Sequence, residues 1–171
     1  MFIERLACLA PLPSQIRKSC PMNQPTIAAL AEALDDEYKA RATYRAVIAA
    51  FGPVQPFVNI VASEERHIAA LIMLYGRYGL DPPADEWEGR IEAPASVTAA
   101  CEAAVRGEEE NAAMYQRLLA VVDKPDVRAV LLRLQSASRD RHLPAFRRCA
   151  GRGVGGGGRG QQRRRTRWSS G

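Results

Sequence analysis

The stretch VNIVASEERHIAALIMLY, residues 58–75, repeats apolar side chains every three or four residues, which predicts a long helix. One face of this helix runs from Phe57 to Tyr78 and is apolar except at its middle, where Glu64 and His67 stand. A Glu and a His three residues apart lie on neighbouring turns, so both side chains can bind one metal ion. The alternative interpretation is a charged turn that faces solvent.

Three further segments have the same helical spacing, and each has recognisable ends. A first helix is predicted over residues 26–51, with Thr26 as its N-cap. A third is predicted from Ser96, its N-cap, to a break at residues 123–125, and a fourth from there to about residue 150. The sequence therefore predicts an all-α domain of four helices over residues 26–150.

The link between the second and third predicted helices is long. Residues 79–95 contain three prolines and no periodicity. Fully extended, they reach about 56 Å, which exceeds the roughly 36 Å length of a 24-residue helix. The link can therefore run the whole length of the bundle and make the second and third helices parallel. The prediction is two antiparallel hairpins joined by a long crossover, not an up-down-up-down bundle.

Each predicted helix carries ionisable side chains on its inner face, at or near mid-length. They are Glu37, Glu64, His67, Glu108 and His142. Burying several carboxylates without partners is costly and raises their pKa values, whereas a divalent metal ion supplies compensating positive charge. The pattern favours a metal site. The alternative is a buried salt-bridge network that uses Arg41 and Arg139.

In this layer the chain resembles the ferritin-like superfamily, especially rubrerythrin and bacterioferritin. The matching segments are DEYKARATY (36–44), EERH (64–67), EEENAAMY (108–115) and SRDRHLPAF (138–146). The likeness covers about residues 27–149. The sequences of these short segments look most like those of a bacterial ferritin-like family of unknown function.

The resemblance implies a ferritin-like four-helix bundle that binds iron, or manganese, and reacts with oxygen or peroxide as a ferroxidase, a peroxide reductase or a related oxidoreductase. The implied metal ligands are Glu37, Glu64, His67, Glu108 and His142. Tyr44 and Tyr115 each stand seven residues after a carboxylate of the layer, where their hydroxyls could bond a ligand or a bound oxygen species. Tyrosine on a helix face is also ordinary core material.

The fourth helix departs from the pattern of the resembled proteins, in which a Glu stands three residues before the histidine. Arg139 occupies that position here, three residues before His142. One metal position has a complete set of ligands, Glu37, Glu64, His67 and a bridging Glu108. The other position has only Glu108 and His142 as ligands. We therefore expect one tightly bound ion and at most one weak ion, with the Arg139 guanidinium lying where the second ion would be.

Two of the four cysteines fall at matching positions in the third and fourth helices. Cys101 lies seven residues before Glu108, and Cys149 lies seven after His142. In antiparallel helices both steps run about 10 Å in the same direction, which puts the two cysteines at one level. They either form a disulfide, which needs a Cα separation near 5.5 Å, or remain two buried thiols. No C-x-x-C spacing is present, which argues against a zinc ribbon or a thioredoxin-like motif.

The net charge of +5 comes from the C-terminal tail. Residues 151–171 hold six arginines, no acid and eight of the 13 glycines, so the rest of the chain carries −1. This composition predicts disorder, and arginine with glycine is also typical of segments that bind nucleic acid through phosphate charge. Residues 1–25 have several prolines and no periodicity, and are expected to be poorly ordered, with Met22 as an alternative start.

The remaining expectations concern location and partners. No run of the chain approaches the ~20 apolar residues of a membrane span, and the N-terminus is a poor secretory signal, so we expect a cytoplasmic protein. The expected partners are metal ions, with oxygen or peroxide as substrate, and a homodimer is left open. The alternative function is a metal-free helical bundle with a structural or interaction role, associated with nucleic acid through its basic tail.

Overall fold

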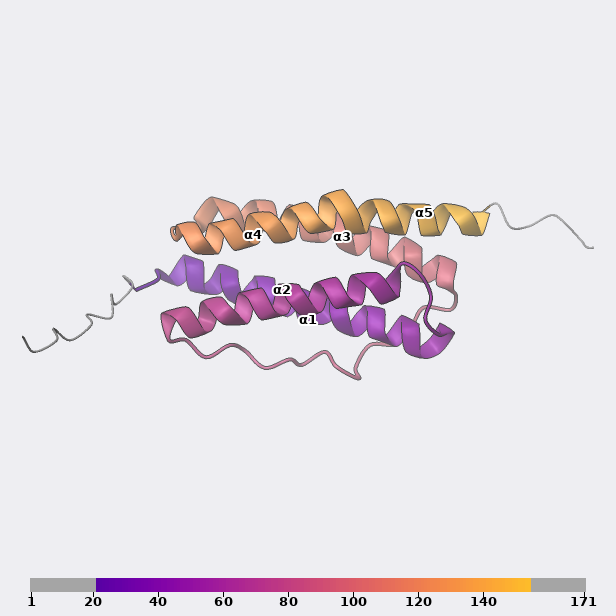
Figure 1. Cartoon of the computed structure of the whole chain (residues 1–171), viewed down its shortest axis with the longest axis horizontal. Coiled ribbons are helices and arrows are strands. Elements are labelled where there is room, and N and C mark those ends of the chain that lie inside the picture. Colours follow the sequence, from indigo (N-terminus) through magenta and orange to yellow (C-terminus); the bar gives the residue numbers. More distant parts are fainter. Residues whose placement is uncertain (1–20, 155–171) are drawn as a thin grey trace, which may run out of the picture.

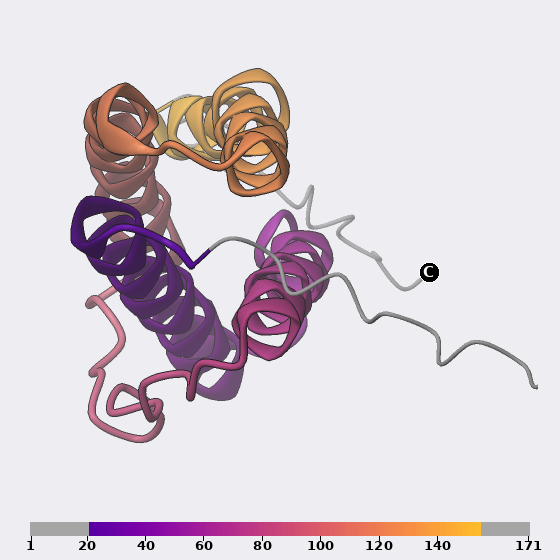
Figure 2. The same cartoon turned by 90° about the vertical axis from the view of Figure 1, so that its left-hand side faces the viewer.

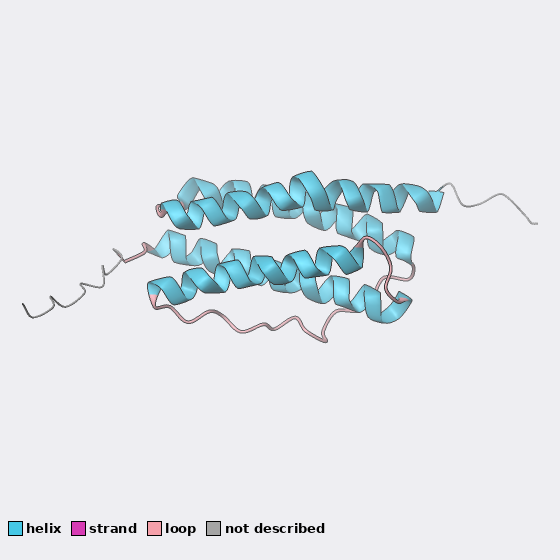
Figure 3. Ribbon diagram, viewed as in Figure 1, coloured by secondary structure: helices cyan, strands magenta, loops and turns pink. Residues whose placement is uncertain are grey.

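The computed structural model describes residues 21–154, with side chains up to residue 152, and every regular element in this range is a helix (Figure 1, Figure 3). The elements are α1 (Gln24–Phe51), α2 (Phe57–Tyr78), α3 (Val97–Val121), α4 (Pro125–Ala137), η1 (Ser138–His142) and α5 (Leu143–Val154). The all-α prediction is confirmed. The expectations for residues 1–20 and 155–171, including nucleic-acid binding by the tail, lie outside the described residues.

The start of α1 differs from the prediction. Asn23, and not Thr26, is the N-cap, because its side chain accepts a hydrogen bond of 2.8 Å from the Thr26 amide. Thr26 is instead buried in the first turn, and its hydroxyl donates to Oδ1 of Asp123 at 2.7 Å. The predicted cap therefore serves to tie the start of α1 to the loop between α3 and α4. The N-cap predicted for α3, Ser96, is as expected.

The predicted fourth helix is one rod made of three pieces, α4, η1 and α5 (Figure 1). Its middle piece, η1, is a π-helical turn in which the Leu143 amide donates to the carbonyl of Ser138, five residues earlier. Such a turn inserts one extra residue into a helix and is frequent at functional sites. The rod also continues to Val154, four residues beyond the predicted boundary at residue 150.

The topology is that of two antiparallel hairpins. The link of residues 79–96 runs along the outside of the bundle, so α2 and α3 point in the same direction (Figure 1). Trp87 fixes the link to α1 by donating its indole N–H to Oδ1 of Asp35 at 2.8 Å, and Asp85 pairs with Arg41. Viewed end-on, the four rods surround a common bundle axis (Figure 2).

The apolar core is divided into two clusters along the bundle axis. One includes Leu30, Leu71, Leu118 and Leu131, and the other includes Val47, Phe57, Ile60 and Phe146. The buried ionisable side chains lie between these clusters, so each end of the polar layer is closed by packed apolar residues. None of the helices in residues 21–154 combines the length and the low polarity that crossing a membrane requires.

A disulfide joins Cys101 of α3 to Cys149 of α5, with a Cα–Cα separation of 5.8 Å. Both residues belong to the second apolar cluster. The separation lies within the range that a disulfide needs, so the predicted register between the third and fourth helices is correct.

Candidate metal centre

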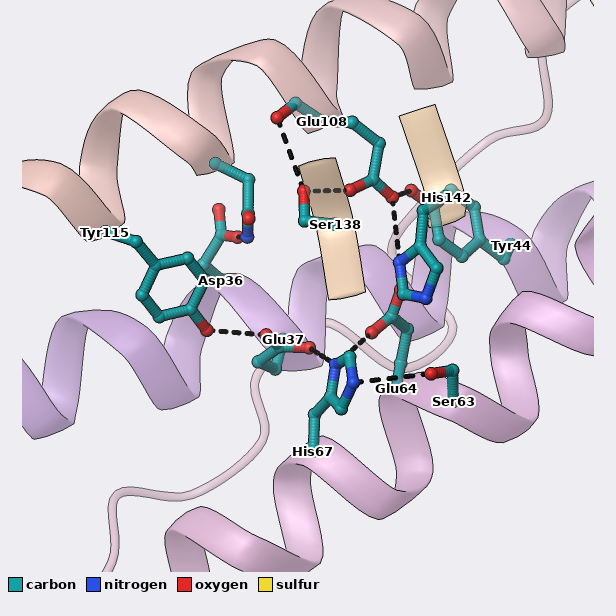
Figure 4. A network of polar contacts seen from close by, with 11 residues as sticks. Asp36, Glu37, Tyr44, Ser63, Glu64, His67, Glu108, Tyr115, Ser138 and His142 are labelled. Carbon is teal, nitrogen blue, oxygen red and sulfur yellow. Dashed lines mark hydrogen bonds and ion pairs between the residues drawn. The ribbon is translucent and has the colours of Figure 1, made fainter. Parts of the chain in front are cut away.

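Four helical rods bring the predicted ligand side chains together at mid-bundle. Glu37 comes from α1, Glu64 and His67 from α2, Glu108 from α3 and His142 from the end of η1 (Figure 4). All five are buried, with at most 9% of the residue exposed. The apolar neighbours on each helix, spaced at three and four residues, turn these polar positions inward because burying the neighbours is favourable.

The His67 ring lies between two carboxylates. Its Nδ1 is 2.8 Å from Oε2 of Glu64 and 3.1 Å from Oε2 of Glu37. Its other nitrogen, Nε2, lies 3.3 Å from the hydroxyl of Ser63, one helical turn earlier. No role was predicted for Ser63, although its spacing of four residues from His67 would have suggested the contact.

The His142 ring lies in a second, similar position. Its Nδ1 is 3.2 Å from Oε1 of Glu64 and 3.4 Å from Oε1 of Glu108. The two imidazoles are stacked, with ring centroids 5.6 Å apart and planes inclined by 22°. The sequence had assigned the bridging position to Glu108. In the structure Glu64 is the central carboxylate, because each of its oxygens faces one histidine.

The two tyrosines bond the carboxylates of the opposite helix. Tyr44 of α1 donates to Oε1 of Glu108 at 2.8 Å, and Tyr115 of α3 donates to Oε1 of Glu37 at 2.6 Å (Figure 4). Each outer carboxylate therefore has one oxygen held by a tyrosine. The sequence predicted the hydroxyls at this level but not which carboxylate each would reach.

The π-helical turn determines what surrounds Glu108. Ser138 and His142, at the two ends of η1, both face inward, and the Ser138 hydroxyl donates to Oε2 of Glu108. The expectation for Arg139 was wrong. Its side chain is exposed and pairs with Asp140 at 2.8 Å, so its guanidinium is not in the layer. Arg41 also pairs outside the layer, with Asp85.

Both histidines hold a proton strongly in the metal-free protein. For His67, burial disfavours the charged ring, but hydrogen bonds to Glu37 and Glu64 outweigh it and raise the pKa to about 10. For His142, burial again opposes the charge, and hydrogen bonds to Glu108 and Glu64 raise the pKa to about 9. Each imidazolium thus supplies positive charge to the carboxylates beside it.

The pKa values of Glu37 and Glu64 are shifted in opposite directions. Burial, together with repulsion from the Glu64 carboxylate, raises the pKa of Glu37 to about 8. Burial also works to raise the pKa of Glu64, but hydrogen bonds from His142 and His67 outweigh it and lower the value to about 2. Glu64 is therefore ionised at neutral pH, and it is the negative centre that both histidines share.

Carboxylate oxygens and imidazole nitrogens are donors that suit iron, manganese and zinc. Glu64, His67 and His142 offer one ligand atom each, and these atoms lie within 4.8 Å of one another. Two atoms that bind the same ion at about 2.1 Å are themselves about 3 Å apart, which is the range of the contacts between the histidines and the carboxylates. The residues present therefore fit a divalent metal ion.

No protein-family model matches the chain, and no curated protein matches it. Solved structures of similar fold include the hypothetical protein MJ0754 of Methanococcus jannaschii, with a TM-score of 0.71 and 22% identity over 85% of this chain and 87% of that chain. The conserved hypothetical protein rv2844 of Mycobacterium tuberculosis has a TM-score of 0.63 and 19% identity, over 74% of this chain and 91% of that chain. At these identities the likeness shows the fold alone.

Proposed function

We propose that this protein is a ferritin-like bundle that binds iron or manganese between its helices and uses the ion in oxidation chemistry with oxygen or peroxide. The activity we expect is ferroxidase, peroxide reduction or a related oxidation. The proposed ligands are Glu37, Glu64, His67, Glu108 and His142. The proposal combines the resemblance of these segments to ferritin-like proteins with the geometry of the buried layer.

The observation that carries the proposal is the composition of this layer. Three carboxylates and two imidazoles are buried together, and within residues 21–152 no lysine or arginine forms an ion pair with any of them. A purely structural network of buried carboxylates would be expected to use arginine, whose fork of donors matches a carboxylate. Carboxylates and imidazoles that converge without a lysine or arginine among them are typical of a metal site.

The two halves of the site differ in how tightly their outer carboxylates are held. Glu37 accepts a hydrogen bond from Tyr115 through Oε1, which leaves Oε2 facing His67. Glu108 accepts from Tyr44 through one oxygen and from Ser138 through the other. We therefore expect the tighter ion beside His67 and a weaker one beside His142. This is the stoichiometry expected from the sequence, one tight ion and at most one weak ion, but the cause is now the Ser138 hydrogen bond to Glu108 and not Arg139.

A bound iron or manganese ion would supply one-electron chemistry and an open coordination position for oxygen or peroxide. The protein's own contribution is to orient the donors. Tyr44 and Tyr115 fix the outer carboxylates, and Ser63 fixes the ring of His67. The two apolar clusters exclude water from the ends of the layer.

The competing function is a metal-free helical bundle with a structural or interaction role. The raised pKa values of His67 and His142 favour it, because protonated imidazoles can neutralise the carboxylates without a metal ion. The two functions differ in one measurable property. A metal ion that binds the folded protein and not the unfolded chain raises the melting temperature, and the increase grows with metal concentration. If protonated histidines alone neutralise the carboxylates, the melting temperature does not depend on metal concentration.

The test is a set of thermal melts of the full chain with and without Mn²⁺, or with Fe²⁺ under anaerobic conditions, together with elemental analysis after purification. We expect metal to raise the melting temperature of the parent, and His67→Ala and Glu64→Ala to abolish this increase. The matched control is Glu65→Ala, at the adjacent exposed position that pairs with Arg45. Absence of metal in the parent, with melts that do not change on metal addition, would rule out the proposal.

A further inference from the structure

A cavity of about 280 Å³ reaches the candidate metal centre from the side, between α1 and α3. Its floor carries the buried ligands, including Glu37, Glu64 and His142. The exposed residues Arg106 and Glu110 of α3 also line it, so the cavity opens to solvent. Its volume is just below the ~300–1,000 Å³ of ordinary small-molecule sites. It is far larger than oxygen or peroxide requires.

Small residues create this opening. Ala40 on α1 and Ala103, Ala104 and Gly107 on α3 line the cavity. A Cβ atom added at Gly107 would meet no atom within 4 Å. Glycine in a helix interior lowers stability by roughly 1 kcal/mol relative to alanine, so Gly107 lowers the stability of α3 at a position where an alanine would fit without a clash.

The mouth of the cavity carries two cations that form no ion pair within the described residues. Arg106 comes from α3 and Lys39 from α1. The Lys39 ammonium rests over the Trp87 ring, 5.5 Å from its centroid. A contact of this kind at an exposed site is worth only about 0.5–1 kcal/mol, so the side chain can exchange it for an anion. Two acids, the exposed Glu110 and the half-buried Asp36, line the cavity beside these cations, and within the described residues neither forms an ion pair with Lys39 or Arg106.

Inside the mouth, Asn111 presents an unused acceptor. Its amide nitrogen donates to Oδ2 of Asp36 at 2.6 Å, whereas its Oδ1 has no hydrogen-bond partner among the residues that the structure describes, although the residue is 92% buried. A buried acceptor without a partner costs about 1–3 kcal/mol. Asn111 lines the same cavity. A molecule that carries a donor group next to its acidic group would satisfy both features.

We propose that this cavity binds a small organic acid whose carboxylate is held at the mouth by Arg106 and Lys39 and whose body extends toward the buried ligands. A role of this acid as a substrate rests on the proposed function, because only a metal ion at the floor of the cavity would give the acid a reaction. Binding of the acid does not rest on the proposed function. The cations, the volume and the unused acceptor all belong to the protein itself.

Benzoate and methyl benzoate test the binding, because they differ by one methyl group, neither carries a hydrogen-bond donor, and only benzoate is charged. Each is titrated into the ¹⁵N-labelled, metal-free full chain while the Gly107 amide and the Asn111 side-chain amide are followed by NMR. We expect benzoate to shift both signals and to bind at least tenfold more tightly than methyl benzoate. The double variant Lys39→Gln/Arg106→Gln should remove this preference.

Gly107→Leu tests the location, because it should fill the cavity and abolish the benzoate shifts at Asn111. Gly76→Leu is its matched control, since Gly76 is also an exposed helical glycine with no atom within 4 Å of an added Cβ, and it lies outside the cavity. Equal binding of benzoate and methyl benzoate, or unchanged binding in Gly107→Leu, would overturn the proposal. Metal binding is measured separately, so benzoate binding without metal binding would reject only the proposed function.

Discussion

The hydroxyl of Tyr44 on α1 donates a 2.8 Å hydrogen bond to Glu108 on α3, and this bond has a counterpart of 2.6 Å that runs from Tyr115 on α3 to Glu37 on α1. Two crossed tyrosine–carboxylate pairs thus join the first helices of the two hairpins. All four side chains are buried. Because each pair lies beside one histidine, the same bonds that hold α1 against α3 also orient the outer carboxylates of the candidate metal centre.

The first prediction concerns Tyr44. Tyr44→Phe should lower the free energy of unfolding by about 1–3 kcal/mol, because the buried Glu108 loses a donor. Urea unfolding of the metal-free protein measures this change. Tyr75→Phe is the control, since the Tyr75 hydroxyl is buried and has no hydrogen-bond partner within residues 21–152, so its removal should be neutral or stabilising. Equal losses in the two variants would mean that the Tyr44 bond contributes nothing.

The second prediction concerns pH and the stability of the metal-free protein. Between about pH 6.5 and 9 the folded chain keeps protons on His67 and His142 that the unfolded chain has lost. Between about pH 4.5 and 8 the folded chain also keeps a proton on Glu37 that the unfolded chain has lost, because the pKa of Glu37 is raised from 4.5 to about 8. The unfolded state therefore binds fewer protons over this range, so the free energy of unfolding should fall as pH rises. In His67→Ala this decline should be shallower.

Metal affinity should change with pH in the opposite direction, because a metal ion must displace the same protons. We expect Mn²⁺ to bind at least tenfold more tightly at pH 8.5 than at pH 6.5. Calorimetry in buffers of different ionisation enthalpy should show proton release on binding. An affinity that does not vary with pH would contradict the placement of these protons on the ligands.

The third prediction concerns Ser138. Ser138→Asp places a carboxylate beside His142, where Ser138 now bonds Glu108, and should raise the affinity of the second metal position at least tenfold. Arg139→Glu should have no such effect, because position 139 faces solvent and its side chain pairs with Asp140. Elemental analysis and calorimetric titration give the stoichiometry. A gain in Arg139→Glu alone would show that the π-helical turn does not hold in solution.

The fourth prediction concerns the disulfide. Reduction, or the double variant Cys101→Ala/Cys149→Ala, should lower the free energy of unfolding by about 4 kcal/mol in the loop-entropy model, because the bond spans 48 residues. Melts with and without a reductant measure the change. The double variant should no longer respond to the reductant. If the parent also fails to respond, the two thiols are free in the folded protein.

Much of the fold could be read from local patterns. Spacing at three and four residues placed Glu37, Glu64, His67 and Glu108 on inner faces, because burial follows the angle per residue of a regular helix. The same reasoning aligned Cys101 with Cys149 across antiparallel helices. The length of the link allowed the crossover, and the contacts of Trp87 and Asp85 with α1 show how it is held.

The predictions of the helix ends were less accurate, because a capping side chain can instead form a hydrogen bond with a distant residue. Thr26 has a good N-cap side chain, yet its hydroxyl bonds Asp123 from the other hairpin, and Asn23 takes the cap. Sequence spacing cannot show that contact, since 97 residues separate the two partners. Local propensity is a weak preference that tertiary context routinely overrides.

The sequence alone determined which side chains face the centre of the bundle, and the tertiary structure decided which of them meet. Glu64, not Glu108, became the central carboxylate, and each tyrosine reached the opposite helix, because these contacts depend on the axial offset between helices. The π-helical turn at Ser138 likewise broke the regular period on which the role of Arg139 had been inferred. Periodicity is a property of one helix, whereas a site between helices is fixed by their packing.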